Sequence, residues 1–284
     1  MRAVLHCQEY ADQSPREVYA SLLSKGQYHC SVSTMYRILR DSQEIVERRN
    51  QLARVSYARP ELLATKPNEV WSWDITKLKA EDKWCYYFLY VVMDVYSRYV
   101  VAWCVATKEN AEIAKQLILE ACLAHNIKGG QLTIHADRGS SMTSKAVSQL
   151  LTDLDVARTH SRPHVSNDNC YSEAQFKTLK YRPDFPKRFE NQQVATSFCT
   201  EFFVWYNTQH HHSGIAMLTP ETVHFGRAQQ EIENRQAVLD EQYQRNPDRF
   251  VKRPPKHPQL PAGVYINPPI PAPETETATA ANVE

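Results

Sequence analysis

Three carboxylates carry most of the chemical information in the sequence. Asp74 follows the strand-like run at residues 70–73, Asp137 ends the strand-like run at 132–136, and Glu173 lies in a helix-like segment. Carboxylate oxygens are the ligands that hard divalent cations prefer, and Mg²⁺ keeps several waters, so a site needs only two or three carboxylates. Distant stretches of the chain can bring these side chains into one cleft, which would then bind Mg²⁺ or Mn²⁺.

Spacing and local sequence decide whether the three acids belong together, because a single aspartate at a strand end is usually just solvated. Thirty-five residues separate Asp137 from Glu173. This gap resembles that of the catalytic core of the DDE integrases and transposases. The local sequence is similar to that of transposases of bacterial insertion sequences at WDIT (73–76), HADRGS (135–140) and SEAQFKTLK (172–180). The similarity extends from about Pro15 to Arg227.

The resemblance implies an α/β fold, with a ribonuclease H-like core of a mixed five-stranded sheet and flanking helices behind a small helix-turn-helix domain. It implies a transposase that cleaves and joins DNA ends by metal-dependent hydrolysis and transesterification. Asp74, Asp137 and Glu173 are then the catalytic and metal-binding residues, and they hold two Mg²⁺ or Mn²⁺ ions roughly 3.5 to 4 Å apart. Without a cation the cluster is costly, because like charges raise one another's pKa.

Two lysines follow the glutamate on the same helical face. Lys177 and Lys180 lie four and seven residues after Glu173, which is the spacing of neighbours on one face. In retroviral integrases, lysines at such offsets resemble those that contact viral DNA ends, so both are predicted to bind DNA. The alternative is a salt bridge between positions i and i+4, which stabilises a helix by about 0.2 to 0.5 kcal/mol.

Two further features flank the acids. Arg138 and Gly139 directly follow the second aspartate, where a glycine lets the backbone approach a phosphate, and Arg138 is predicted to contact DNA. Many loops after strands have the same composition. Asp168 precedes the helix of Glu173 and is predicted to cap it rather than to bind metal.

The first 48 residues indicate a helix-turn-helix. Ser14 and Pro15 suit a helix start, and either Ser31 or Ser33 caps a second helix through residues 34–40. Arg37 and Arg40 on that second helix are predicted to contact DNA. The alternative is a helical hairpin without a nucleic-acid partner.

The central region alternates strand and helix patterns. Strands are predicted at 69–78, 85–96, 99–106, 132–135 and 156–160, and helices at 110–125, 144–154 and 169–180. Three strands followed by alternating helix and strand resemble the ribonuclease H-like fold. Two more helices, at 192–206 and from 220, are predicted to pack behind the site.

Prolines and changes in composition mark the predicted domain boundaries. They are a helix-turn-helix segment at 1–48, a linker at 49–66, an integrase-like catalytic core at 67–228, a helical extension at 229–252 and a tail at 253–284. The tail holds eight of the sixteen prolines. It is predicted to be disordered.

Composition excludes several other classes. The longest apolar run is interrupted by Asp94, so no membrane helix is predicted, and the N-terminus lacks the apolar core of a signal peptide. The seven cysteines form no CxxC pair and are predicted to be reduced. The predicted location is therefore the bacterial cytoplasm, in association with the nucleoid.

The predicted partner is double-stranded DNA, both element ends and target. Resemblance to insertion-sequence transposases implies a homo-oligomer on paired ends and a possible product of an upstream reading frame. Two alternatives stay open: a catalytically decayed DNA-binding derivative, and a nuclease of the same fold that cleaves RNA in RNA-DNA hybrids. A strand-transfer assay separates the first from a transposase, and substrate preference separates the second.

Overall fold

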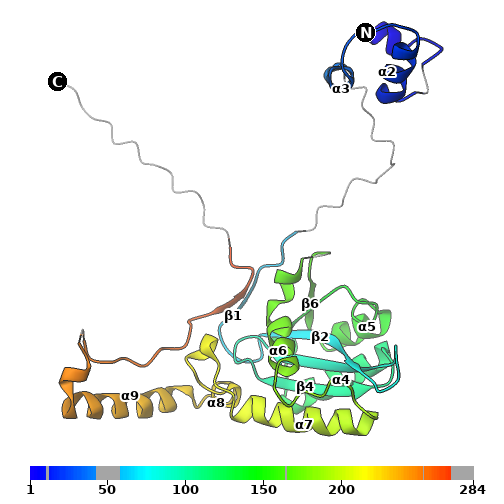
Figure 1. Ribbon diagram of the computed structural model, residues 1–284. Helices are drawn as coiled ribbons and strands as arrows, with labels where there is room; N and C mark the ends of the chain where they lie inside the picture. The colour runs from blue at the N-terminus through cyan, green and yellow to red at the C-terminus, as the bar shows by residue number, and fades with distance from the viewer. Residues whose placement is uncertain (11–12, 43–57, 164, 252, 270–284) are drawn as a thin grey trace, which may run out of the picture. The chain divides into compact units, whose positions relative to one another are not determined.

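The computed structural model describes residues 1–10, 13–42, 58–163, 165–251 and 253–269. The chain forms two compact units, Met1–Ser56 and Tyr57–Glu284, and each is described by itself (Figure 1).

The N-terminal unit is a cluster of helices around a small apolar core. Its helices are α1 (Arg2–Leu5), α2 (Pro15–Ser24) and α3 (Val32–Asp41). Ser14 and Glu17 form a reciprocal capping box at the start of α2, and Ser31, not Ser33, caps α3. The core consists of Leu5, Tyr10, Val18, Leu22 and Met35. Arg37 and Arg40 are both exposed on α3.

The larger unit contains the mixed five-stranded sheet that the sequence predicts. Its strands are β2 (Val70–Lys79), β3 (Tyr86–Asp94), β4 (Val100–Ala106), β5 (Thr133–Ala136) and β6 (Ala157–His160), in the order β4-β3-β2-β5-β6. The pairs β2–β3 and β3–β4 are antiparallel, whereas β2–β5 and β5–β6 are parallel. This topology agrees with the predicted ribonuclease H-like core.

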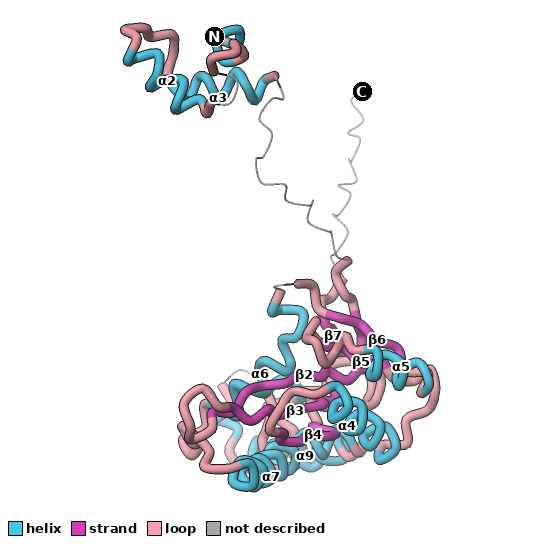
Figure 2. The backbone as a smooth tube through the Cα atoms, turned by 90° about the vertical axis from the view of Figure 1, so that its right-hand side faces the viewer, coloured by secondary structure: helices cyan, strands magenta, loops and turns pink. Residues whose placement is uncertain are grey.

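Helices cover both faces of this sheet (Figure 2). Helices α4 (Ala111–Ala124) and α5 (Lys145–Asp153) pack on one face, and α6 (Cys170–Lys180) and α7 (Gln192–Thr208) pack on the other. Successive side chains of a strand point to opposite faces. Trp71 and Trp73 of β2 therefore join the core beneath α4 and α5, whereas Leu78 joins the core beneath α6 and α7. Ser72 and Asp74 point to the same face as Leu78, toward α6 and the residue that precedes it.

A two-stranded sheet ties the start of the larger unit to its end. Strand β1 (Leu62–Ala64) pairs antiparallel with β7 (Val264–Ile266). Strand β1 lies in the predicted linker at 49–66, and β7 lies in the predicted disordered tail at 253–284. Both predictions are therefore wrong at these strands. Proline content dominated the prediction, and a partner about 200 residues away in sequence leaves no local signal. Residues 49–57 and 270–284 lie outside the described residues.

The remaining elements follow the core. They are the helices α8 (Pro220–His224) and α9 (Ala228–Arg245) and the 3₁₀ turns η1 (Ser166–Asn169), η2 (Ser213–Ile215) and η3 (Pro247–Arg249). The seven cysteines, all in described parts of the chain, are free thiols. A membrane-spanning length of apolar helix is absent from the described residues.

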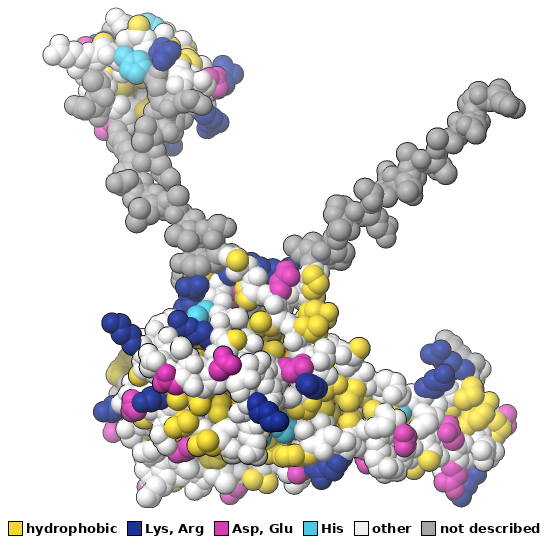
Figure 3. All heavy atoms as spheres, turned by 180° about the vertical axis from the view of Figure 1, so that it is seen from behind, with side chains coloured by type: hydrophobic (Ala, Val, Ile, Leu, Met, Phe, Trp, Pro, Cys, Tyr) yellow, Lys and Arg dark blue, Asp and Glu magenta, His cyan; other side chains and the backbone are white. Residues whose placement is uncertain are grey.

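Charged side chains are mixed over one face of the larger unit (Figure 3). On the face shown in Figure 3, lysines and arginines are scattered among acidic and apolar side chains and do not gather into one patch. This agrees with the formal net charge of +1. Electrostatic attraction to a polyanion must therefore arise from local groups of cations.

Candidate active site

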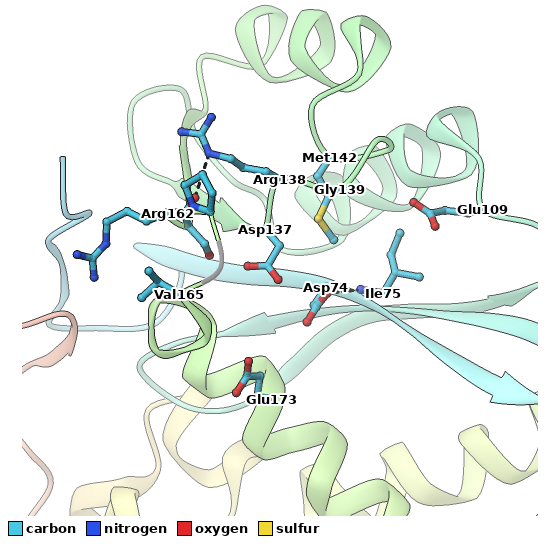
Figure 4. A pocket seen from close by; sticks show the side chains of 12 residues that line it. Asp74, Ile75, Glu109, Asp137, Arg138, Gly139, Met142, Arg162, Val165 and Glu173 are labelled. Atoms are coloured by element: carbon cyan, nitrogen blue, oxygen red, sulfur yellow. Dashed lines mark hydrogen bonds between the residues drawn. The ribbon is translucent and has the colours of Figure 1, made fainter. Parts of the chain in front are cut away.

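The three predicted carboxylates line one cavity of about 770 Å³ (Figure 4). Asp74 lies in the middle of β2, Asp137 directly follows β5, and Glu173 lies in the first turn of α6. Trp73 pairs with Ala136 where β2 and β5 run parallel, so the next residue on each strand is one of the two aspartates. Helix α6 packs on β2 and brings the glutamate to the same cavity.

Burial and the two neighbouring carboxylates determine the ionisation of Asp74. Burial, and to a smaller extent the nearby charges of Asp137 and Glu173, together raise the pKa of Asp74 to about 7. The Ile75 N–H donates to Asp74 Oδ1 at 2.7 Å and opposes this rise, as does the charge of Lys180. Without a bound cation, Asp74 therefore loses its proton only near neutral pH.

The donor set fits a hard divalent cation. Within the described residues no group of three or more His, Cys, Asp or Glu side chains is placed to hold a metal ion without further ligands or movement, and this includes the three acids. A structural zinc site would need such a closed cage, whereas Mg²⁺ takes a few carboxylates and completes its shell with water and phosphate oxygens. Three carboxylates around an open cavity, one of them with a pKa raised by burial and by the charges of the other two, match the second case.

Charge repulsion between Asp137 and Asp74 should lower the stability of the metal-free protein at high pH. The pKa of Asp74 is about 7 in the folded chain, against an ordinary value of 3.8 for an aspartate in water. The neutral carboxyl thus favours folding below about pH 4, and this stability is lost as the pH rises through about 7. We expect Asp137→Asn to raise the metal-free Tm by about 2 to 4 °C at pH 8 and by much less at pH 5. Thermal melts in EDTA measure both values, and an equal rise at the two pH values would contradict the electrostatic origin.

A network of short polar side chains orients Asp74. Asn169 Nδ2 donates to Asp74 Oδ2 at 3.2 Å, and Ser72 Oγ donates to Asn169 Oδ1 at 2.7 Å. Ser72 Oγ also lies 2.6 Å from Ser172 Oγ. Sequence reasoning missed Asn169. Its signal was its position four residues before Glu173, which places both side chains on one side of the same turn.

Asp168 does not cap α6, so that prediction is wrong. Its carboxylate accepts from the backbone N–H, Nε and Nη2 of Arg162 at 2.8 to 3.0 Å, and from Asn267 Nδ2 at 2.7 Å. Burial opposes ionisation, but these hydrogen bonds lower the pKa of Asp168 to about 2. The 3₁₀ turn η1 precedes α6 and turns the carboxylate away from the helix end. Asp168 instead joins Arg162, which lines the cavity, to the residue after β7.

Glu109 is a fourth carboxylate on the cavity wall, and sequence reasoning missed it too. Its Oε1 accepts from Ser141 Oγ at 3.0 Å and from Ser140 Oγ at 3.4 Å. Both serines belong to the loop that follows Asp137. Glu109 therefore anchors this loop to the segment that leads into α4, and its position just before the Asn110 cap was the available signal.

The predicted DNA contacts differ in their placement. Lys180 Nζ donates to Thr76 Oγ1 at 2.6 Å, and Arg138 Nε donates to Ser161 O at 3.1 Å on the cavity wall. Lys177 is exposed on α6, one turn after Glu173. The structure thus brings two cations next to the acids and a third onto the same helix. Arg37 and Arg40 lie in the other unit.

The fold and the site together define an α/β catalytic core of the integrase type: a mixed sheet with acids from two parallel strands and one helix around a single cavity. Integrase core domain models match residues 64–166 and 154–220. The chain is 31% identical over 172 residues to the transposase for insertion sequence element IS904 of Lactococcus lactis, covering 58% of this chain and 67% of that protein. It therefore belongs to the integrase-core transposases of insertion sequences.

Other relatives are more distant. The chain is 27% identical over 159 residues to the InsF transposase for insertion sequence IS3A of Escherichia coli, with 56% of this chain and 54% of that protein covered, so it spans about half the length of that relative. A chain of the simian T-cell lymphotropic virus intasome in complex with PP2A regulatory subunit B56 gamma is similar over 79% of this chain and 74% of its own, at 18% identity and a TM-score of 0.45. The HTLV-2 integrase catalytic core domain in complex with magnesium is similar over 56% and 97%, at 19% identity and a TM-score of 0.40.

Proposed function

We propose that this chain cleaves and joins the DNA ends of an insertion sequence by divalent-metal-dependent hydrolysis and transesterification. The observation that carries the proposal is the convergence of Asp74, Asp137 and Glu173 on one cavity in a chain of the transposase family. The substrate is double-stranded DNA, both the element end and the target. The acting species is a homo-oligomer on paired ends.

Asp74, Asp137 and Glu173 would hold the metal, Mg²⁺ or Mn²⁺, as two ions. When bound, the ions neutralise the carboxylates, activate the attacking oxygen of water or of a DNA 3′ end, and stabilise the leaving oxygen. The residues of the chain supply the rest, because phosphoryl transfer depends mainly on positioning and charge. Asn169 orients Asp74, and Glu109 fixes the loop after Asp137.

A strand-cleavage and joining assay tests this function. Duplexes that carry the terminal repeats of the element should be nicked at the end and joined to a target in Mg²⁺, and EDTA should stop both steps. An RNA-DNA hybrid of the same length is the comparison substrate. Preference for the hybrid would favour a nuclease of the same fold, and binding of the ends without metal-dependent cutting would favour a decayed DNA-binding derivative.

Lys177 and Lys180 are proposed to contact phosphates of the bound end. We expect the double substitution to alanine to weaken end binding about tenfold and to reduce the slope of log affinity against log salt by about 2, because two phosphate contacts are lost. Fluorescence anisotropy in EDTA at several salt concentrations measures both. Lys128→Ala, an exposed lysine beyond α4, is the control. An unchanged salt slope would assign the two lysines to intrachain interactions alone.

Asn169 is proposed to be a positioning residue for Asp74. We expect Asn169→Ala to lower the cleavage rate about tenfold without weakening DNA binding. Loss of its hydrogen bond to the carboxylate raises the pKa of Asp74 further, so the acidic limb of the pH-rate profile should move to higher pH. Rates at saturating DNA between pH 6 and 9 measure this, with the exposed Asn167→Ala as control. A slower enzyme with an unshifted profile would show a merely structural role.

A further inference from the structure

The turn between β2 and β3 presents a tryptophan to solvent. Trp84 is 86% exposed, whereas Trp71 and Trp73 on the adjoining strand are fully buried. Its φ is 68°, in the left-handed region that a bulky side chain rarely adopts and that costs on the order of 1 to 3 kcal/mol. Neither burial nor local backbone preference therefore explains a tryptophan at this position.

Trp84 separates two recesses of opposite charge. One, of about 410 Å³, is lined by Trp84 with Lys79, Lys83 and Arg188, and it has no carboxylate in its wall. The other, of about 490 Å³, includes Glu81, Asp82 and Glu190. An anionic ligand that contacts the indole ring is therefore directed to the basic side.

The turn itself is held firmly. Arg188 Nη1 donates to the backbone oxygens of Ala80, Glu81 and Asp82 at 2.7 to 3.4 Å. The Glu81 N–H donates to Phe189 O at 3.0 Å. These bonds fix the backbone that carries the indole ring, so little order needs to be gained when a ligand stacks on it.

Cations connect this turn to the active site. Lys180 Nζ donates to Thr76 Oγ1 at 2.6 Å, and Thr76 lies on β2 between Asp74 and Lys79. Lys180 therefore lies within electrostatic reach of both the catalytic acid and the turn. Lys79 lies five positions after Asp74 along the strand, a span of roughly 17 Å. A nucleic-acid strand covers that distance in about five nucleotides at 3.4 Å each.

We propose that the β2–β3 turn is a second DNA contact, in which Trp84 stacks on an unpaired base while Lys79 and Lys83 bind the phosphates beside it. The inference rests on the proposed function of the site and adds the form of DNA that the site prefers. The base must be unpaired or terminal, because the faces of bases inside a duplex are already stacked. Stacking on an aromatic ring beside basic side chains is the usual way to bind single strands.

Binding in EDTA tests the proposal apart from catalysis. The probes are a blunt duplex of the element end and the same duplex with five unpaired nucleotides beyond it, and anisotropy gives both affinities. We expect Trp84→Ala to bind the flanked DNA about tenfold more weakly and the blunt DNA almost as the parent does. Trp84→Phe keeps a flat ring and should retain most of the affinity. Lys79→Ala with Lys83→Ala should weaken binding and flatten the salt dependence by about 2, whereas Lys128→Ala should change neither.

Stability separates a lost contact from a damaged fold. Glycine adopts the φ of this position without strain, so Trp84→Gly should raise the Tm by about 2 to 4 °C while it weakens binding of flanked DNA as Trp84→Ala does. Unchanged affinity of Trp84→Ala for flanked DNA would overturn the proposal. This holds also if the substitution alters the oligomeric state instead. If the parent chain cleaves element ends in that case, the proposed function stands. A parent chain that binds neither the blunt nor the flanked duplex would overturn both the proposed turn contact and the proposed function.

Discussion

Replacing any one of Asp74, Asp137 and Glu173 by its amide should reduce DNA cleavage and joining on the order of 10³-fold or more. The amide keeps the shape of the side chain but removes a charged oxygen ligand, so the metal is held weakly and in the wrong place. The three carboxylates line one cavity, and the charges of Asp137 and Glu173 act on Asp74, so each loss affects the whole site. Single-turnover cleavage of labelled element ends in Mg²⁺ measures the rate.

End binding in EDTA should be nearly unchanged in all three variants, because the metal is absent from that assay. Glu201→Gln, at an exposed glutamate of α7, is the matched control and should cleave at the parental rate. A variant that kept near-parental turnover would exclude its residue from the catalytic site.

Asp168→Asn should produce the second largest effect, on stability and activity together. The Asp168 side chain is completely buried and accepts three hydrogen bonds from Arg162 and one from Asn267. An amide cannot accept all of them, and it leaves a guanidinium without its counter-charge. We expect the Tm to fall by about 5 °C or more and cleavage to slow at least tenfold, because η1 and the start of α6 lose their anchor. Thermal melts and single-turnover rates measure these effects.

The effect of Asp168→Asn on the Tm should depend on pH in the acid range. The pKa of Asp168 is about 2 in the folded chain, below the ordinary aspartate value of 3.8. Its ionised form thus stabilises the fold above about pH 4, and this stability is lost as the pH falls through about 2. The difference in Tm between parent and Asp168→Asn should be constant above pH 5 and shrink below pH 4. A difference that stays constant into acid would mean that the charge of Asp168 does not contribute.

Local sequence was sufficient for most of the fold. The caps at Ser14 and Ser31 are short-range hydrogen bonds, so residue type and spacing predict them. The strands of the central sheet follow from β-branched and aromatic runs, and the spacing of the acids gave Asp74, Asp137 and Glu173 by family resemblance. The structure adds that parallel pairing of β2 with β5 places the two aspartates side by side.

Long-range partners account for what the sequence did not predict. Asp168 has the residue type and the position of a helix cap, but Arg162 and Asn267 determine where its carboxylate points. Asn169 contacts Asp74 across 95 positions of sequence. Strand β7 exists because β1 pairs with it, not because of its own composition. The position of Asn169 before Glu173 is a local signal, but the identity of each long-range partner is not visible in one sequence.

The most direct test of the account is an anomalous diffraction map of the protein bound to an element-end duplex in millimolar Mn²⁺. The account predicts anomalous peaks in the cavity, in contact with Asp74 and with at least one of Asp137 and Glu173, and loss of those peaks in Asp74→Asn. Well-ordered DNA in the cavity with no peak beside these carboxylates would contradict the claim that they form one cation-binding site.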